Sequence, residues 1–492
     1  MKFQAEMRRT MGEIQTTLRR GLHRKNSTSS LHSIASFAAS ITSKETWKEL
    51  YRDFYKAGVT AGMIRERKDQ IVGLFHPPVI VEEVPEFEAP GTAIPTGVKG
   101  SDDPPNEAMA EKKKRTISLR INWAPLNALL GPLLIEAVKS GDTNAVRFRL
   151  AVVGNLGYRD INECTALYWA AARGHREIVQ LLLDKGAIIE ATRNTGATAL
   201  YISAENGHSE VVKLLLEKGA NTEAARNTGE TALYIAAYNG HSEIVKLLLD
   251  QGANTEAALD TGATALYSSA YNGHLEVVKL LLDKGANTEA ALDTGATALY
   301  TSAQNGHLEV VGLLLDRGAD TEATLDTGGT ALYASAYNGH SAVVKLLLDN
   351  GANTEAARNT GTTALYISAY NGHLEIVKLL LDKGANTEAV RNTGATALYT
   401  SAQNGHPEVV ELLLDKGANI EAALDTGETA LYIAAQNGYP EVVKLLLDNS
   451  ANPEAARNNG TTALYISAYQ GYPDIVKLLL ENGANTDRKS VV

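Results

Sequence analysis

The tetrapeptide Thr-Ala-Leu-Tyr recurs ten times in this chain, and each copy begins 33 residues after the one before it. The first copy starts at Thr165 and the last at Thr462. A unit of this length folds into one small supersecondary element that cannot bury its own apolar face, so successive units must stack on one another. Such an array offers an extended surface rather than a reaction pocket.

Charge divides the chain into two unlike parts. From Gly131 onward, 26 Lys and Arg face 42 Asp and Glu, a net charge of −16, whereas residues 1–130 carry 20 against 15, a net charge of +5. An acidic array disfavours nucleic acid as a ligand, because binding would have to overcome repulsion from the phosphates.

Cys164 is the only cysteine, which excludes an intramolecular disulfide and favours a reducing compartment. We therefore expect a cytoplasmic protein.

The first 76 residues form the first predicted region, which is basic and helical. Apolar residues from Phe3 to Leu22 recur at steps of three and four with arginines between them, a pattern that predicts an amphipathic helix. This helix could pack on the next one, bind a partner helix or an anionic membrane, or serve as a mitochondrial presequence. The sequence also predicts a second short helix, which begins at a capping box over residues 42–45 and ends at Gly58.

Residues 77–130 form the second predicted region, a flexible and disordered linker. Seven prolines lie between Pro77 and Pro105, where no hydrophobic periodicity is present. The basic run Lys112 to Arg115 follows and resembles a nuclear import signal, although such runs are commonly just solvated charge. The nucleus is therefore an alternative compartment.

The unit at residues 193–225 illustrates the fold expected over residues 131–492. Gly196 supplies a turn with positive φ, and Thr198 can cap a first helix in which the small Ala204 allows close packing. A second helix opens at His208, and Gly219 provides its left-handed stop. The sequence thus predicts an all-α array of paired helices.

These motifs resemble the ankyrin repeat family, whose units combine a Gly-x-Thr-Pro-Leu-His turn, Gly-His, a Val-Val-x-Leu-Leu-Leu helix and Gly-Ala. The resemblance covers residues 165–486, with a looser unit from Leu133, and it implies a solenoid of about eleven units similar to the arrays of fungal ankyrin proteins. Tyr201 and its equivalents replace the family's histidine, so the hydrogen bonds that this histidine makes between repeats cannot be carried over. The aspartate that opens the family's hairpin is replaced by arginine in five units (Arg193, Arg226, Arg358, Arg391 and Arg457) and by leucine in four (Leu259, Leu292, Leu325 and Leu424).

No motif indicates catalysis, a cofactor or a metal site. Eight histidines recur every 33 residues from His175 to His406, but stacked helices lie roughly 8–10 Å apart, whereas zinc needs donors within about 2.3 Å of one point. We interpret these histidines as structural capping residues. The chain also lacks a phosphate-binding loop and a Gly-x-Ser-x-Gly elbow, so we do not expect an enzyme.

The candidate binding residues stand two places before each Gly-His or Gly-Tyr pair from Gly207 onward. We call these nine residues the first-helix stripe: Glu205, Tyr238, Tyr271, Gln304, Tyr337, Tyr370, Gln403, Gln436 and Tyr469. The resemblance implies that they face a concave groove and contact a protein ligand, and tyrosine is typical of interface hot spots. Trp169 adds an aromatic residue at the opening of the same face. The alternative is that the stripe only fills space between units.

Two functional hypotheses follow. The first is a non-catalytic scaffold that binds a protein partner on the concave face of the array. The second is a sensor or receptor-like regulatory protein whose N-terminal helices are the effector and whose repeats recognise the signal. The apolar helix from Ile475 to Leu480 lies near the C-terminal end of the sequence, and it could stay partly exposed or be covered by the N-terminal helices or by a second molecule. We expect self-association through the last repeat.

Overall fold

The computed structural model describes residues 124–151 and 156–486. The helices expected over residues 1–76, most of the expected linker and its basic run lie outside these described residues. The chain divides into two compact units, Met1–Asp160 and Ile161–Val492, and each is considered by itself.

The first unit contains a helix pair that corresponds to the looser repeat. Helix α6 spans Ala124–Ser140, and so begins within the last residues of the predicted linker, while α7 spans Thr143–Leu150. Gly141 turns between them with φ of 72°, and the Asp142 carboxylate caps α7 by accepting from the Ala145 amide at 2.9 Å.

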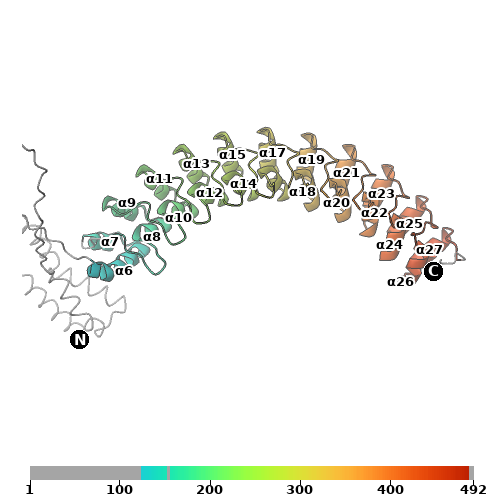
Figure 1. The fold of residues 1–492 in the computed structure, drawn as a ribbon, viewed down its shortest axis with the longest axis horizontal. Helices are drawn as coiled ribbons and strands as arrows, with labels where there is room; N and C mark the ends of the chain where they lie inside the picture. Colours follow the sequence, from blue (N-terminus) through green and yellow to red (C-terminus); the bar gives the residue numbers. More distant parts are fainter. Residues whose placement is uncertain (1–123, 152–155, 487–492) are drawn as a thin grey trace, which may run out of the picture. The chain divides into compact units, whose positions relative to one another are not determined.

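The second unit consists of ten further helix pairs (Figure 1). The first helices of the pairs are α8 (Ala166–Ala172), α10 (Ala199–Glu205), α12 (Ala232–Tyr238), α14 (Ala265–Tyr271), α16 (Ala298–Gln304), α18 (Ala331–Asn338), α20 (Ala364–Asn371), α22 (Ala397–Gln403), α24 (Ala430–Asn437) and α26 (Ala463–Gln470). The second helices are α9 (Arg176–Asp184), α11 (Ser209–Glu217), α13 (Ser242–Asp250), α15 (Leu275–Asp283), α17 (Leu308–Asp316), α19 (Ser341–Asp349), α21 (Leu374–Asp382), α23 (Pro407–Asp415), α25 (Pro440–Asp448) and α27 (Pro473–Glu481).

Within this unit the pairs stack into an arc. The first helices lie along its concave side and the second helices along its convex side (Figure 1). The described residues contain helices and isolated β-bridges but no strand, so the all-α solenoid predicted from the period is confirmed.

The first helices follow from their caps and from alanine. The Thr198 hydroxyl accepts a hydrogen bond from the Tyr201 amide at 3.1 Å, and the equivalent threonines cap every first helix of the second unit in the same way. Ala204 is fully buried. Its small side chain lets the neighbouring first helices approach closely. The helix ends at Glu205, and Gly207 with φ of 77° redirects the chain.

The second helices are amphipathic and bury their apolar side chains beneath the first helices. In α11, Val212 and Leu215 are fully buried, and Gly219 follows the helix with φ of 83°. His208 occupies the position just before α11, but its side chain makes no capping hydrogen bond. These histidines are therefore N-cap residues by position, as predicted, but their side chains do not cap the helices. The hydrogen bond that the side chains do make is described below.

Neighbouring units are also joined along their return loops. The Glu190 carboxylate accepts a hydrogen bond from the Asn221 amide of the next unit at 2.8 Å, and the same bond recurs in every later unit up to Asn485. Lys218 pairs with Asp184 of the preceding unit at 3.1 Å, but such exposed pairs contribute little stability. These links lie outside the first-helix stripe.

Candidate protein-binding surface

The first-helix stripe lies at the C-terminal ends of the first helices, as the sequence register predicts. Its central tyrosines are half exposed: 45% for Tyr238, 47% for Tyr271, 51% for Tyr337 and 44% for Tyr370. Gln304 and Tyr469 are also exposed, whereas Glu205, Gln403 and Gln436 are partly buried. All five tyrosines of the stripe are thus exposed, whereas Gln304 is the only exposed residue among its four polar members.

The backbone of the stripe is held by the next unit along the chain. The carbonyl of Tyr238 accepts hydrogen bonds from Asn272 Nδ2 at 3.2 Å and from His274 Nε2 at 3.0 Å. The carbonyls of Glu205, Tyr271 and Tyr337 accept hydrogen bonds from the equivalent Asn and His of their own next units. The carbonyls of Gln304 and Tyr370 accept only the bond from the His, and that of Gln403 only the bond from the Asn. The histidines of the Gly-His pairs therefore link units. These links use backbone carbonyls and so do not occupy the stripe side chains, although the Tyr337 ring stacks on Tyr333 of its own helix with the ring centres 6.5 Å apart.

Trp169 is separate from the stripe. It lies three residues before Ala172, which holds the stripe position in its unit, and it is partly buried. Its ring packs edge-on against Tyr168 with the ring centres 6.0 Å apart. The structure thus places Trp169 on the same first helix but one turn away from the stripe.

The tyrosine of each Thr-Ala-Leu-Tyr motif is here called the repeat tyrosine. Except for Tyr465 in the last described unit, it packs beneath the hairpin of the next unit. The Arg226 guanidinium stacks 5.2 Å from the centre of the Tyr201 ring, and the same stack joins Arg358 to Tyr333, Arg391 to Tyr366 and Arg457 to Tyr432. Burial, partly offset by the hydrogen bond from Arg226, raises the pKa of Tyr201 to about 12. The replacements of the family's histidine and aspartate thus pack against each other across units.

Three of the four leucine hairpins cover the repeat tyrosines less completely, whereas Tyr399 before the Leu424 hairpin is buried. Three successive hairpins open with Leu259, Leu292 and Leu325, and the repeat tyrosines beneath them, Tyr234, Tyr267 and Tyr300, are only partly buried. Burial still raises the pKa of Tyr234 and of Tyr300. This middle stretch of the array therefore exposes two rows of tyrosines, the repeat tyrosines and the stripe.

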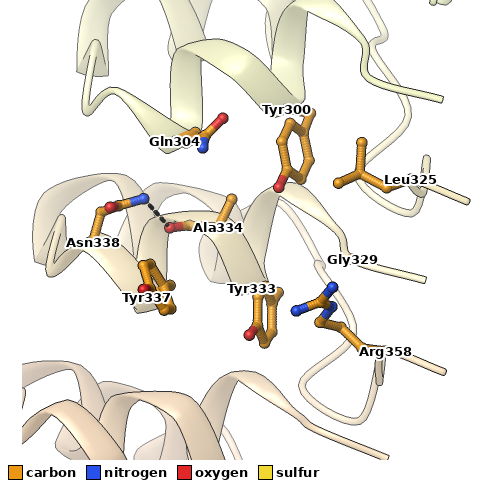
Figure 2. Close-up of a pocket in the computed structure, with 9 residues that line it drawn as sticks. All are labelled: Tyr300, Gln304, Leu325, Gly329, Tyr333, Ala334, Tyr337, Asn338 and Arg358. Atoms are coloured by element: carbon orange, nitrogen blue, oxygen red, sulfur yellow. Dashed lines mark hydrogen bonds between the residues drawn. The ribbon is translucent and has the colours of Figure 1, made fainter. Parts of the chain in front are cut away.

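A pocket of about 250 Å³ lies where this stretch meets the next arginine hairpin. Figure 2 shows it between α16 and α18, with Tyr300 and Gln304 from α16, Tyr333 and Tyr337 from α18, and Arg358 beside the Tyr333 ring. Leu325, Gly329, Ala334 and Asn338 complete its lining. This pocket is not among the features expected from the sequence.

The described residues show no arrangement suited to metal chemistry or to membrane crossing. No group of three or more His, Cys, Asp or Glu side chains among them could hold a metal ion. None of the helices in this part of the chain is both long enough and apolar enough to cross a bilayer.

Comparison with protein families agrees with the geometry. The family model for ankyrin repeats, which describes three copies at a time, matches residues 134–226, 221–291, 288–358, 353–424 and 418–490. The chain belongs to the ankyrin repeat family. Ankyrin repeats are generally protein–protein interaction modules, and their fold is typically a non-catalytic scaffold. A search of curated proteins finds no match to the chain.

Proposed function

We propose that this ankyrin repeat protein is a non-catalytic scaffold that binds a protein partner along the first-helix stripe. The observation that carries the proposal is the row of half-exposed tyrosines whose backbones are fixed by the neighbouring unit. Tyrosine offers a large contact area with few rotatable bonds, so little conformational entropy is lost when a partner binds. A backbone that is already ordered lowers that cost further.

The concave side also separates binding from stability. The hydrogen bonds between units involve the stripe through its carbonyl oxygens, and the repeat tyrosines and arginines pack one turn away. An exposed stripe ring can therefore contact a partner without being required by the core. This separation favours an interface over the alternative in which the rings only fill space between units.

A crosslinking experiment tests which face binds. A photoreactive phenylalanine analogue is introduced at Tyr271 or Tyr337 in the full chain, and as a matched control at Lys279 or Lys345, which are exposed on the second helices α15 and α19. We expect covalent adducts with a protein partner in the native cell from the two tyrosine positions and not from the two lysine positions. Adducts from the lysine positions alone would overturn the proposal.

A further inference from the structure

Two places in the array differ by essentially one residue at the hairpin. The hairpins at Leu325 and Leu424 read Leu-Asp-Thr-Gly-Gly-Thr and Leu-Asp-Thr-Gly-Glu-Thr, so Gly329 corresponds to Glu428. The first helices that precede them, α16 and α22, have the same sequence, and the hairpins that follow them open with Arg358 and Arg457. The surroundings of Glu428 can therefore be compared directly with the pocket at Gly329.

At the second place, the chain binds its own carboxylate. Glu428 Oε1 lies 3.0 Å from Arg457 Nε, and Glu428 Oε2 accepts a hydrogen bond from the Tyr399 hydroxyl at 3.5 Å and one from Thr426 Oγ1 at 3.2 Å. The Arg457 guanidinium also stacks 5.7 Å from the centre of the Tyr432 ring. The Glu428 side chain is only 15% exposed. Two repeat tyrosines and an arginine from the next hairpin therefore form a site that accepts a carboxylate.

A third unit uses the same position in the same way. Glu230 occupies the same position in its hairpin as Gly329 and Glu428 do in theirs. Its Oε2 accepts hydrogen bonds from Arg226 Nη1 at 2.7 Å and from the Tyr201 hydroxyl at 3.5 Å. Here the arginine comes from the same hairpin rather than the next one. A carboxylate at this register thus pairs with a stacked arginine in both units that have one.

At Gly329 the equivalent groups are present and the carboxylate is missing. Tyr300 stands in the register of Tyr399, and Arg358 stacks 5.3 Å from the centre of the Tyr333 ring, as Arg457 does on Tyr432. Arg358 forms no ion pair within the described ranges 124–151 and 156–486. The space that a glutamate would fill is the pocket of about 250 Å³.

The backbone does not require glycine at this position. A Cβ atom added to Gly329 would lie 3.8 Å from its nearest neighbour, a ring carbon of Tyr333, which is an ordinary contact distance. The φ angle of Gly329 is not in the left-handed region, unlike that of Gly328 at 80°. The absence of a side chain at Gly329 therefore opens a pocket without serving the turn.

We propose that the pocket at Gly329 binds the carboxylate of a glutamate or aspartate side chain of the protein partner. The proposal rests on the proposed function and names the chemistry that the partner presents. Arg358 pairs with the carboxylate, the rings of Tyr300 and Tyr333 enclose its methylene groups, and Gln304 and Asn338 at the edge can bind the partner's backbone. Stacking on Tyr333 holds the guanidinium in place before the partner arrives.

The acidic net charge of the array does not exclude this ligand. Asp326 lies on the pocket's own hairpin, but Asp425 occupies the same place beside Glu428, where a carboxylate is bound. The next hairpin adds Arg391, which also lacks an ion pair in the described part of the chain. Arg358, which lines the pocket, and Arg391 on the following hairpin are therefore two arginines that form no ion pair among the described residues.

The test measures the binding of a fluorescent, terminally blocked peptide of alternating Glu and Gly to the full chain by anisotropy. A peptide with Gln in place of each Glu is the matched probe. We expect the Glu peptide to bind about tenfold more tightly than the Gln peptide, and Gly329→Glu to weaken the Glu peptide by about tenfold or more, because the new side chain occupies Arg358. Arg358→Gln should give the same loss.

Two further variants separate site occupancy from added charge. Ala263→Glu places a carboxylate at the same register in a unit whose next hairpin opens with Leu292 rather than arginine, so it should leave the affinity unchanged. Glu428→Gly should create a second site for the Glu peptide. The proposal is overturned if Gly329→Glu binds as tightly as the natural chain, or if the Gln peptide binds equally well. If either result is found while Tyr271 and Tyr337 still crosslink to a partner, the proposed scaffold function is retained and only the carboxylate site is rejected.

Discussion

At the scale of single residues, Ser450 departs from the rest of the array. It follows helix α25 with φ of 69°, in a position where the other units of the array have glycine, as at Gly417 with φ of 86°. A side chain with a Cβ atom is strained in this left-handed conformation, by roughly 1 kcal/mol. One unit of the array is thus less stable than its neighbours for a local reason.

We expect Ser450→Gly to raise the free energy of unfolding by about 0.5–1 kcal/mol, because it removes this strain. Gly417→Ser is the matched control and should lower the free energy of unfolding by a similar amount, since no atom lies within 4 Å of the added Cβ and only the φ angle is affected. Thermal unfolding followed by circular dichroism measures both changes. Equal melting temperatures for the two variants and the natural chain would show that this position carries no strain.

At the scale of helices, the sequence predicted the elements but not all of their contacts. The period, the Thr198 type of cap and the glycine stops fix each helix locally, so they could be found without a structure. The bond from His274 to the carbonyl of Tyr238 spans 36 residues and depends on how the units stack, so the sequence could not show it. The pocket combines Tyr300, Gly329 and Arg358 from three units; its only signal in the sequence is the change from glutamate to glycine between matching hairpins.

The last helix pair, α26 and α27, is less covered than the pairs before it. Tyr465 is 50% exposed, whereas its equivalent Tyr432 is 2% exposed, and Leu480 at the end of α27 is 42% exposed. Tyr465 stacks on Tyr469, with the ring centres 6.4 Å apart. We propose that this apolar end mediates self-association, because an exposed aromatic patch is a ready contact for a second copy of the chain.

Sedimentation of the full chain with a polar capping repeat appended after residue 487 tests this proposal. We expect the natural chain to form a dimer or larger species and the capped chain to be monomeric. The matched control appends a flexible Gly-Ser segment of equal length, which adds mass without covering the helices. If the natural and capped chains sediment as the same species, the exposed end does not drive association.

At the scale of the whole molecule, the first helices and the second helices of the array differ in what they contact. The return loops join the units through Glu190 and its equivalents. The first helices, which lie along the concave side (Figure 1), carry exposed tyrosines at their C-terminal ends. Each unit contacts mainly its neighbours, so stability is shared along the array. Changes confined to exposed stripe side chains should therefore affect binding and leave the fold intact.

The most direct measurement compares two quadruple variants of the full chain, using the partner captured by crosslinking. One changes Tyr238, Tyr271, Tyr337 and Tyr370 to Ala; the other changes the exposed lysines Lys246, Lys279, Lys345 and Lys378 of the second helices to Ala. We expect the tyrosine variant to lose about 2 kcal/mol of binding free energy at each true hot spot, with little change in melting temperature, and the lysine variant to bind normally. A tyrosine variant that melts at a much lower temperature but still binds the partner would show instead that the stripe serves the fold.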